Sequence, residues 1–180
     1  KYADTIEEWL KPFDKYPAIN IHWRMFGTGG KLEHDYCKNV IEQYFTCFDE
    51  LYSHGKCLIN TRYNIASFDL WHHHTYMKYS ICGVKITLPA VNQFGYICTV
   101  DKTWGGGRHK QENATMLINH YFTKAWDIYS AKMHRSDVLF EKNPKADYNY
   151  FYKYEMRCRT EDYTIRRFLI RMKINQGLIK

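Results

Sequence analysis

The spacing of apolar residues predicts helices in four parts of the chain. Thr5 and Glu8 form a capping-box pattern ahead of a short apolar run at helical spacing, so an opening helix is expected there. Residues 35–51 carry one apolar stripe, and Thr123 is positioned to cap a helix that runs to about residue 134. The last helix is predicted to begin near Thr160, with acidic residues in its first turn and arginines opposite its apolar stripe.

Shorter runs show the two-residue alternation of β-strands. Residues 18–26 alternate throughout, so the predicted strand has one apolar face and one unusually polar face. The apolar face carries Ile19, Ile21, Trp23 and Met25, and the other face carries Asn20, His22, Arg24 and Phe26. A glycine-rich loop, residues 27–30, follows and can bring backbone N–H groups close to a ligand. Short strands or irregular loops are predicted within residues 56–100, and a further strand over residues 116–122.

Strands mixed with helices, without an internal repeat, indicate the α/β class. With 180 residues, of which 45% are apolar and 17% aromatic, the chain is expected to bury one core, so residues 1–180 are assigned to a single domain. No apolar run reaches membrane-spanning length, so a soluble protein is expected. The six scattered cysteines include no close pair, which argues against zinc and predicts reduced, mostly buried thiols.

The charge balance favours an anionic partner. The chain has 26 Lys and Arg against 19 Asp and Glu, a net charge of +7, which suits a phosphate-bearing substrate, nucleic acid or lipid headgroups. The basic residues are spread along the chain, and no known nucleic-acid-binding motif is visible, so nucleic acid is not expected. A basic nucleic-acid-binding module without catalysis remains the alternative function.

Four segments of the chain resemble segments of bacterial glycosyltransferases related to families 2 and 92, and they follow one another in the same order as in that family. The stronger two are IHWRMFGTGG, residues 21–30, and INHYFTKAWDIYSAKMHR, residues 118–135. The weaker two are VIEQYFTC, residues 40–47, and FDLWHHH, residues 68–74. Two positions depart from the family pattern, because His22 replaces an asparagine and Ala125 replaces a serine.

The resemblance implies a partial nucleotide-diphospho-sugar transferase fold, with a Rossmann-like mixed sheet flanked by helices. The chain corresponds to the C-terminal, acceptor-side portion of the catalytic domain, and the donor-binding half with its Asp-x-Asp motif is expected ahead of Lys1. The implied activity is sugar transfer from a nucleotide-sugar donor to a glycan or lipid-linked acceptor in polysaccharide synthesis. This portion is expected to be inactive alone, and to be cytoplasmic with peripheral contact at the inner face of the membrane.

Catalysis of this kind neutralises a departing nucleoside diphosphate and deprotonates the acceptor hydroxyl. By its place in the motif, His120 is the predicted metal ligand, completing a shell of Mn²⁺ or Mg²⁺ whose carboxylates lie outside this chain; imidazole suits Mn²⁺ better. Arg24 is predicted to hold a phosphate or a sugar hydroxyl, and Glu42, or else Asp69, to act as the base. The structural alternatives are a core histidine at 120, an edge-strand arginine in water at 24 and a surface carboxylate at 42.

The predicted substrate-binding residues are His22, Trp71, His72 and Lys124. Trp71, together with Trp104, could stack on a sugar ring. Lys124 and Arg135 could meet the diphosphate, although Arg135 is expected to be solvated.

Overall fold

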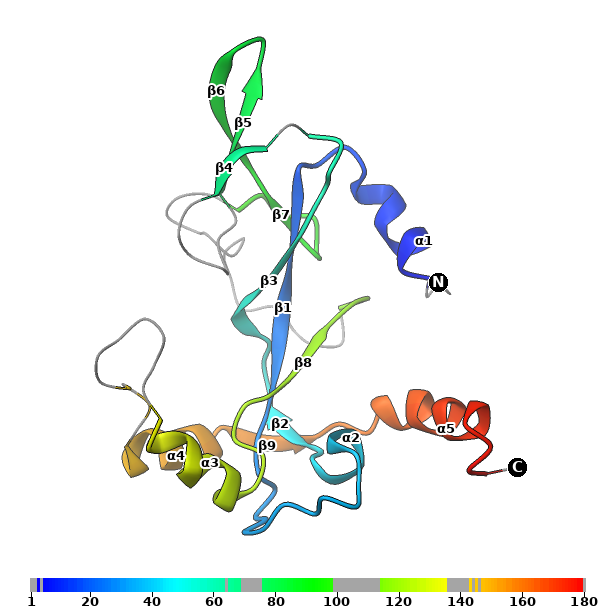
Figure 1. Cartoon of the computed structure of the whole chain (residues 1–180), viewed down its shortest axis with the longest axis vertical. Coiled ribbons are helices and arrows are strands. Elements are labelled where there is room, and N and C mark those ends of the chain that lie inside the picture. Colours follow the sequence, from blue (N-terminus) through cyan, green and yellow to red (C-terminus); the bar gives the residue numbers. More distant parts are fainter. Residues whose placement is uncertain are drawn as a thin grey trace. The chain divides into compact units, whose positions relative to one another are not determined.

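The structure of the chain is a computed structural model that describes residues 3, 5–63, 65–68, 76–98, 114–135, 143, 145 and 147–179 (Figure 1). It is a mixed α/β structure, in which antiparallel strand pairs combine with short helices. The chain divides into two compact units, each built from segments that are far apart in sequence. The first unit comprises residues 1–24 and 50–118, and the second comprises residues 25–49 and 119–180.

The first unit is organised around the long strand β1. Besides β1 (Ala18–Phe26), this part of the unit contains α1 (Ile6–Leu10), the 3-10 helix η1 (Lys11–Phe13), β3 (Tyr52–Ile59) and β7 (Val91–Asn92). Thr5 caps α1 by accepting a hydrogen bond from the Glu8 amide, as the capping-box pattern predicts. β1 pairs with β3 antiparallel and with β7 parallel. Both the opening helix and the first strand are therefore confirmed.

β1 is buried over its whole length, on both faces. Asn20 pairs with Cys57 of β3 and also with Asn92 of β7, so β1 has neighbours along both edges at this residue. On the apolar face, Ile19 and Ile21 pack with Trp9 and Val91 into one core cluster. On the opposite face, Ala18 joins a second cluster with Tyr79, Ala90 and Cys98. The polar residues of this second face are consequently inside the unit.

A three-stranded antiparallel sheet completes the described part of the first unit. Its strands are β4 (Ile65–Phe68), β5 (Tyr76–Ile81) and β6 (Val84–Pro89). Cys82 and Gly83, with φ values of 50° and 80°, make the two-residue turn between β5 and β6. Within the stretch where short strands or irregular loops were predicted, residues 92–96 form a turn, because the Asn92 side chain accepts hydrogen bonds from the amides of Phe94 and Tyr96.

The second unit combines short strands with four helices among its described residues. In chain order these are α2 (Val40–Gln43), β2 (Thr46–Phe48), β8 (Ile118–Tyr121), α3 (Trp126–Met133), α4 (Tyr148–Glu155), β9 (Cys158–Glu161) and α5 (Ile165–Asn175). β2 pairs antiparallel with β9, and Phe26 at the end of β1 pairs with Cys47 of β2. β8, which begins at Ile118, confirms the strand predicted at residues 116–122.

Three helix predictions need correction. The helix predicted over residues 35–51 ends at Gln43, because Tyr44 is extended and residues 46–48 pair with β9. The last helix begins at Ile165 rather than Thr160, since residues 158–161 form the partner strand β9. α3 begins at Trp126, and Thr123 does not cap it. α4 was not predicted, because its aromatic-rich sequence YNYFYKYE has weak helix propensity.

All six cysteines carry free thiols, as expected, and only Cys37 and Cys82 are exposed. Burial raises the pKa of the Cys57 and Cys98 thiols to about 12, and it also raises that of Cys158. At pH 8, a thiol with such a pKa is ionised in roughly one molecule in 10,000, and the thiolate is the reactive species. We therefore expect Ellman's reagent to label two thiols of the native protein quickly and the other four only after unfolding. Rapid labelling of more than two would contradict this arrangement.

No helix in the described part of the chain is long and apolar enough to cross a membrane.

Candidate functional site

The polar face of β1 carries two predicted site residues, His22 and Arg24, together with Asn20, in the first unit. Asn20, His22 and Arg24 are 0%, 2% and 5% exposed. The alternative of an edge-strand arginine in water is therefore wrong. A guanidinium that is buried to this extent is unusual, because arginine side chains are mostly exposed.

Gln93, which sequence reasoning missed, belongs to the same polar face. Its side-chain oxygen accepts a hydrogen bond from the His22 backbone amide at 3.2 Å. The backbone amide of Gln93 donates to the Asn20 carbonyl at 3.1 Å. The His22 ring meets Phe94 edge-on at 6.0 Å. The only sequence signal was a pair of polar residues, Asn92 and Gln93, between two apolar runs.

Two side-chain amides of this face are not satisfied within the described structure. Both polar atoms of the Asn20 side chain and the Nε2 atom of Gln93 are buried without a hydrogen-bond partner. An unpaired buried amide costs about 1–3 kcal/mol, so such groups are rare unless they serve a ligand or water. Asn20, His22, Arg24 and Gln93 together form the polar face site.

In the second unit, Glu155 joins the two stronger of the four segments that carry the family resemblance. Its carboxylate accepts hydrogen bonds from the Thr28 hydroxyl at 2.7 Å, the Thr28 amide at 3.0 Å and the Thr123 hydroxyl at 2.9 Å. Thr28 lies in the glycine-rich loop, and Thr123 follows β8. Because α4 was not predicted, the sequence offered no signal for Glu155.

The same two segments are tied together again a few residues further on. The amides of Trp126 and Asp127 donate to the carbonyls of Lys31 and Leu32 at 3.1 and 3.0 Å. The Asp127 carboxylate accepts from the His34 amide at 3.2 Å. The loop after β1 and the start of α3 are therefore one hydrogen-bonded structure.

His120 and Lys124 lie close together in sequence around the end of β8. The His120 ring is half-buried and stacks on Phe122 at 5.9 Å. Lys124 has a φ of 56°, in the left-handed region, which costs a side chain with a Cβ about 1 kcal/mol. Backbone strain of this kind is concentrated at functional positions, so it is consistent with a functional role for Lys124. Arg135 is exposed, as expected.

Glu42 takes part in structural contacts between α2 and α5. It completes the capping box with Asn39 and forms an ion pair with Lys173. The Lys173 ammonium, and then the hydrogen bond from the Asn39 amide, lower the pKa of the Glu42 carboxyl. A lowered pKa weakens a general base, so this geometry does not support Glu42 in that role, and the assignment stays a prediction.

Several predicted residues lie outside the described part of the chain. They are Asp69, Trp71, His72 and Trp104. Within the described residues, no group of three histidine, cysteine or acidic side chains could hold a metal ion.

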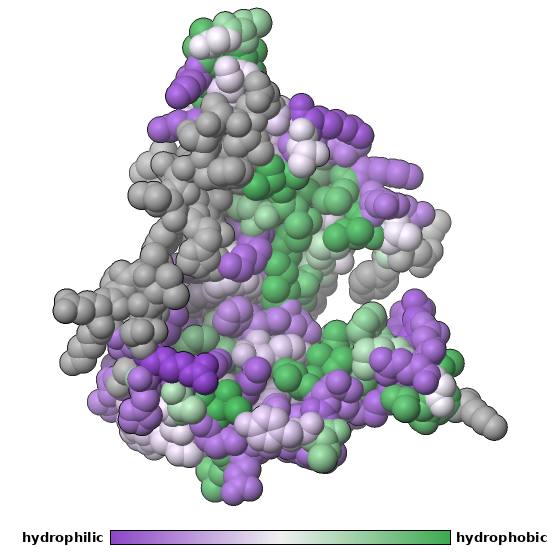
Figure 2. Space-filling view, viewed as in Figure 1, coloured by the Kyte–Doolittle hydropathy of each residue, from purple (hydrophilic) through white to green (hydrophobic). Residues whose placement is uncertain are grey.

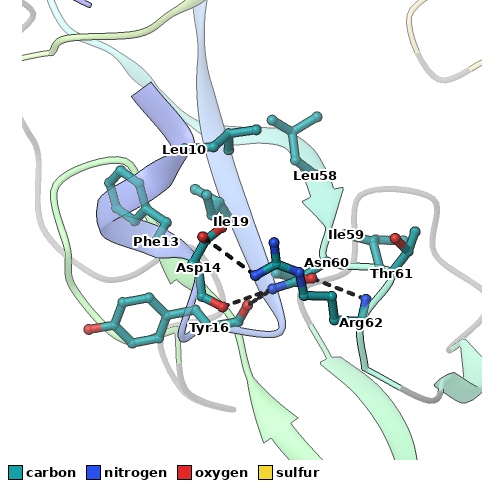
Figure 3. Close-up of a pocket in the computed structure, with 11 residues that line it drawn as sticks. Leu10, Phe13, Asp14, Tyr16, Ile19, Leu58, Ile59, Asn60, Thr61 and Arg62 are labelled. Atoms are coloured by element: carbon teal, nitrogen blue, oxygen red, sulfur yellow. Dashed lines mark hydrogen bonds and ion pairs between the residues drawn. The ribbon is translucent and has the colours of Figure 1, made fainter. Parts of the chain in front are cut away.

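A cavity of about 220 Å³ opens in the first unit between η1, β1 and β3 (Figure 3). Leu10, Phe13 and Leu58 supply apolar walls, and Asp14 and Arg62 form an ion pair of 3.5 Å beside them. Of the described residues predicted for the site, none lines this cavity. Its polar groups are occupied with one another, which favours a structural rather than a catalytic role for them.

Helix α5 presents apolar and charged side chains on the same outer surface (Figure 2). Phe168, Ile170 and Ile174 are exposed beside Arg167 and Arg171. An amphipathic helix of this composition can lie on anionic lipid, so peripheral membrane contact remains a prediction for this helix.

Comparison with known proteins yields no relative: no protein-family model, no curated protein and no solved structure matches this chain.

Proposed function

We propose that the chain is the acceptor-side part of a nucleotide-sugar-dependent glycosyltransferase with a nucleotide-diphospho-sugar transferase fold. The activity would be sugar transfer to a glycan or lipid-linked acceptor. Support comes from the four segments that resemble families 2 and 92. In the second unit, Glu155 joins Thr28 and Thr123 of the two stronger segments, and Phe26 of one stacks on Tyr121 of the other.

The polar face site is the observation that carries the proposal. A core needs neither a buried guanidinium nor unpaired amides, and both would gain from a polyhydroxylated or phosphorylated ligand. The Arg24 guanidinium can donate two parallel hydrogen bonds to a phosphate or to neighbouring hydroxyls. The Asn20 and Gln93 amides offer both donors and acceptors, which matches sugar hydroxyl groups.

The metal expected in such an enzyme would help to neutralise the departing diphosphate. The predicted ligand His120 belongs to no group of three possible metal ligands among the described residues. This donor set alone does not fit a resident metal, so the roles assigned to the polar face site do not depend on one.

The proposal is tested by the release of UDP from a panel of UDP-sugars, using the protein in its full natural length with Mn²⁺ and candidate acceptors. Arg24→Lys is expected to lower kcat/KM roughly 100-fold, because an ammonium cannot reproduce the paired hydrogen bonds. Circular dichroism and thermal unfolding would show that the variant remains folded.

Arg62→Lys is the matched control, since Arg62 is an exposed arginine of the same unit. It should leave UDP release unchanged. The proposal is wrong if no UDP-sugar is turned over, or if a folded Arg24→Lys variant retains full activity. Salt-sensitive binding of oligonucleotides by an inactive protein would favour the nucleic-acid alternative instead.

A further inference from the structure

Two lysines converge on the ring of Phe122 in the second unit. The Lys132 ammonium donates a hydrogen bond to the Phe122 carbonyl at 2.9 Å and lies 5.9 Å from the ring centroid. The Lys145 ammonium lies 5.3 Å from the same centroid. An aromatic face stabilises a nearby cation, so Phe122 can hold both ammonium groups close together.

Hydrogen bonds fix Lys145 beside α3, although 13 positions separate it from Lys132. The Tyr129 hydroxyl donates to the Lys145 carbonyl at 2.8 Å. The Asn143 side chain donates to the carbonyls of Lys132 and Arg135 and accepts from the Lys145 amide. The two ammonium groups are therefore held together by the fold itself.

Four cationic side chains, those of Lys124, Lys132, Arg135 and Lys145, gather at this place in the second unit. Lys132 is half-buried, and its pKa is lowered by burial and then by the repulsion of Lys124, Arg135 and Lys145. None of these side chains forms an ion pair within the described structure.

We propose that Lys132 and Lys145 at the Phe122 ring, together with Lys124 and Arg135 near Lys132, form a binding site for a diphosphate group, termed the Phe122 site. A diphosphate carries several negative charges on adjacent groups, which matches a cluster of cations better than a single phosphate does. In a sugar transferase, this charge would stabilise the leaving diphosphate. Diphosphate binding itself does not depend on the proposed function. Only the identity of the molecule that carries the diphosphate rests on it.

Isothermal titration calorimetry with inorganic pyrophosphate tests the site directly, again with the full-length protein. Lys145→Gln and Lys124→Asn should each weaken binding about ten-fold, because each removes one charge-assisted contact. Asparagine is chosen at 124 because it tolerates the left-handed backbone. Lys153→Gln, at an exposed lysine of the same unit, makes the same change in net charge and should bind as the parent protein does.

Thermal unfolding without ligand provides a second readout. Lys145→Gln should unfold at the same or a higher temperature than the parent protein, because it removes repulsion while keeping the backbone contacts of Lys145. Equal pyrophosphate affinity in the parent and both site variants would overturn the inference. An equal loss in Lys153→Gln would also overturn it, since binding would then follow net charge alone.

Competition identifies the source of the diphosphate. Displacement of pyrophosphate by UDP supports a nucleoside diphosphate, and displacement by farnesyl diphosphate but not UDP supports a lipid-linked diphosphate. A failure to bind any of these ligands contradicts the Phe122 site. The proposed function is judged separately by sugar transfer and by Arg24→Lys, so the two failures are distinguishable.

Discussion

Gly55→Ala is expected to lower the free energy of unfolding by about 3 kcal/mol, at the upper end of the usual cost of overpacking. A Cβ atom at this position would lie 2.0 Å from the Ile21 carbonyl oxygen and 2.8 Å from the Asn20 side-chain oxygen. Gly55 pairs with His22 across β1 and β3, next to the register shift between His22 and Trp23. The obstructing atom belongs to the backbone of a buried strand, so it cannot rotate away and the two strands would have to separate.

Urea denaturation measures this change, with Gly83→Ala as the control. Gly83 has a φ of 80°, and no atom lies within 4 Å of the position that an added Cβ would take, so alanine there costs only the backbone strain, about 1 kcal/mol. The difference between the two variants therefore isolates the contact between β1 and β3. If both variants lose the same amount, Gly55 is not needed for the close approach. The activity of Gly55→Ala should fall as well, because Asn20 and His22 would move.

Glu155→Ala is expected to cost about 3 kcal/mol, because it leaves several buried donors without an acceptor. Thr28 is 4% exposed and Thr123 is fully buried, so water cannot easily replace the carboxylate. The Thr28 hydroxyl also accepts a hydrogen bond from the Gly30 amide, which links the whole glycine-rich loop to α4. Loss of Glu155 should therefore loosen residues 27–30 as well as lower stability.

Thermal unfolding and hydrogen exchange together test the role of Glu155. Glu155→Gln keeps one acceptor oxygen and should lose less stability than Glu155→Ala. Glu33→Ala removes the same charge from an exposed position of the same unit and should change little. Unchanged exchange at the Thr28 amide in Glu155→Ala would show that the loop is held by other contacts.

Both changes concern contacts that join segments far apart in the sequence. Gly55 contacts the strand that carries Arg24, and Glu155 contacts the two stronger segments with the family resemblance. A loss of activity in either variant would therefore report on positioning. Loss in a stable Arg24→Lys variant would report on the ligand contact itself.

Local pattern was sufficient for the elements whose signals lie within a few residues. The capping box at Thr5 and the alternation of residues 18–26 each have their cause nearby in the chain. A side chain that caps a turn, or a two-residue period that separates two faces, acts without distant partners. The polar face of β1, including Arg24, was predicted in this way.

Long-range pairing decided what these local signals left open. The apolar residues between 40 and 48 fit a helical stripe as well as a strand, and pairing of residues 46–48 with β9 selected the strand. The burial of Arg24 could not be predicted either. The sequence showed that one face of this strand is polar, but it did not show that β1 has neighbouring strands along both edges. Glu155 and Lys145 acquired their roles only when α4 and the segment before it packed against residues 27–30 and α3. The sequence alone therefore determined the local elements and the polar face of β1. The tertiary structure determined that this face is buried and that the cationic side chains of the Phe122 site lie together, because both depend on contacts between distant segments.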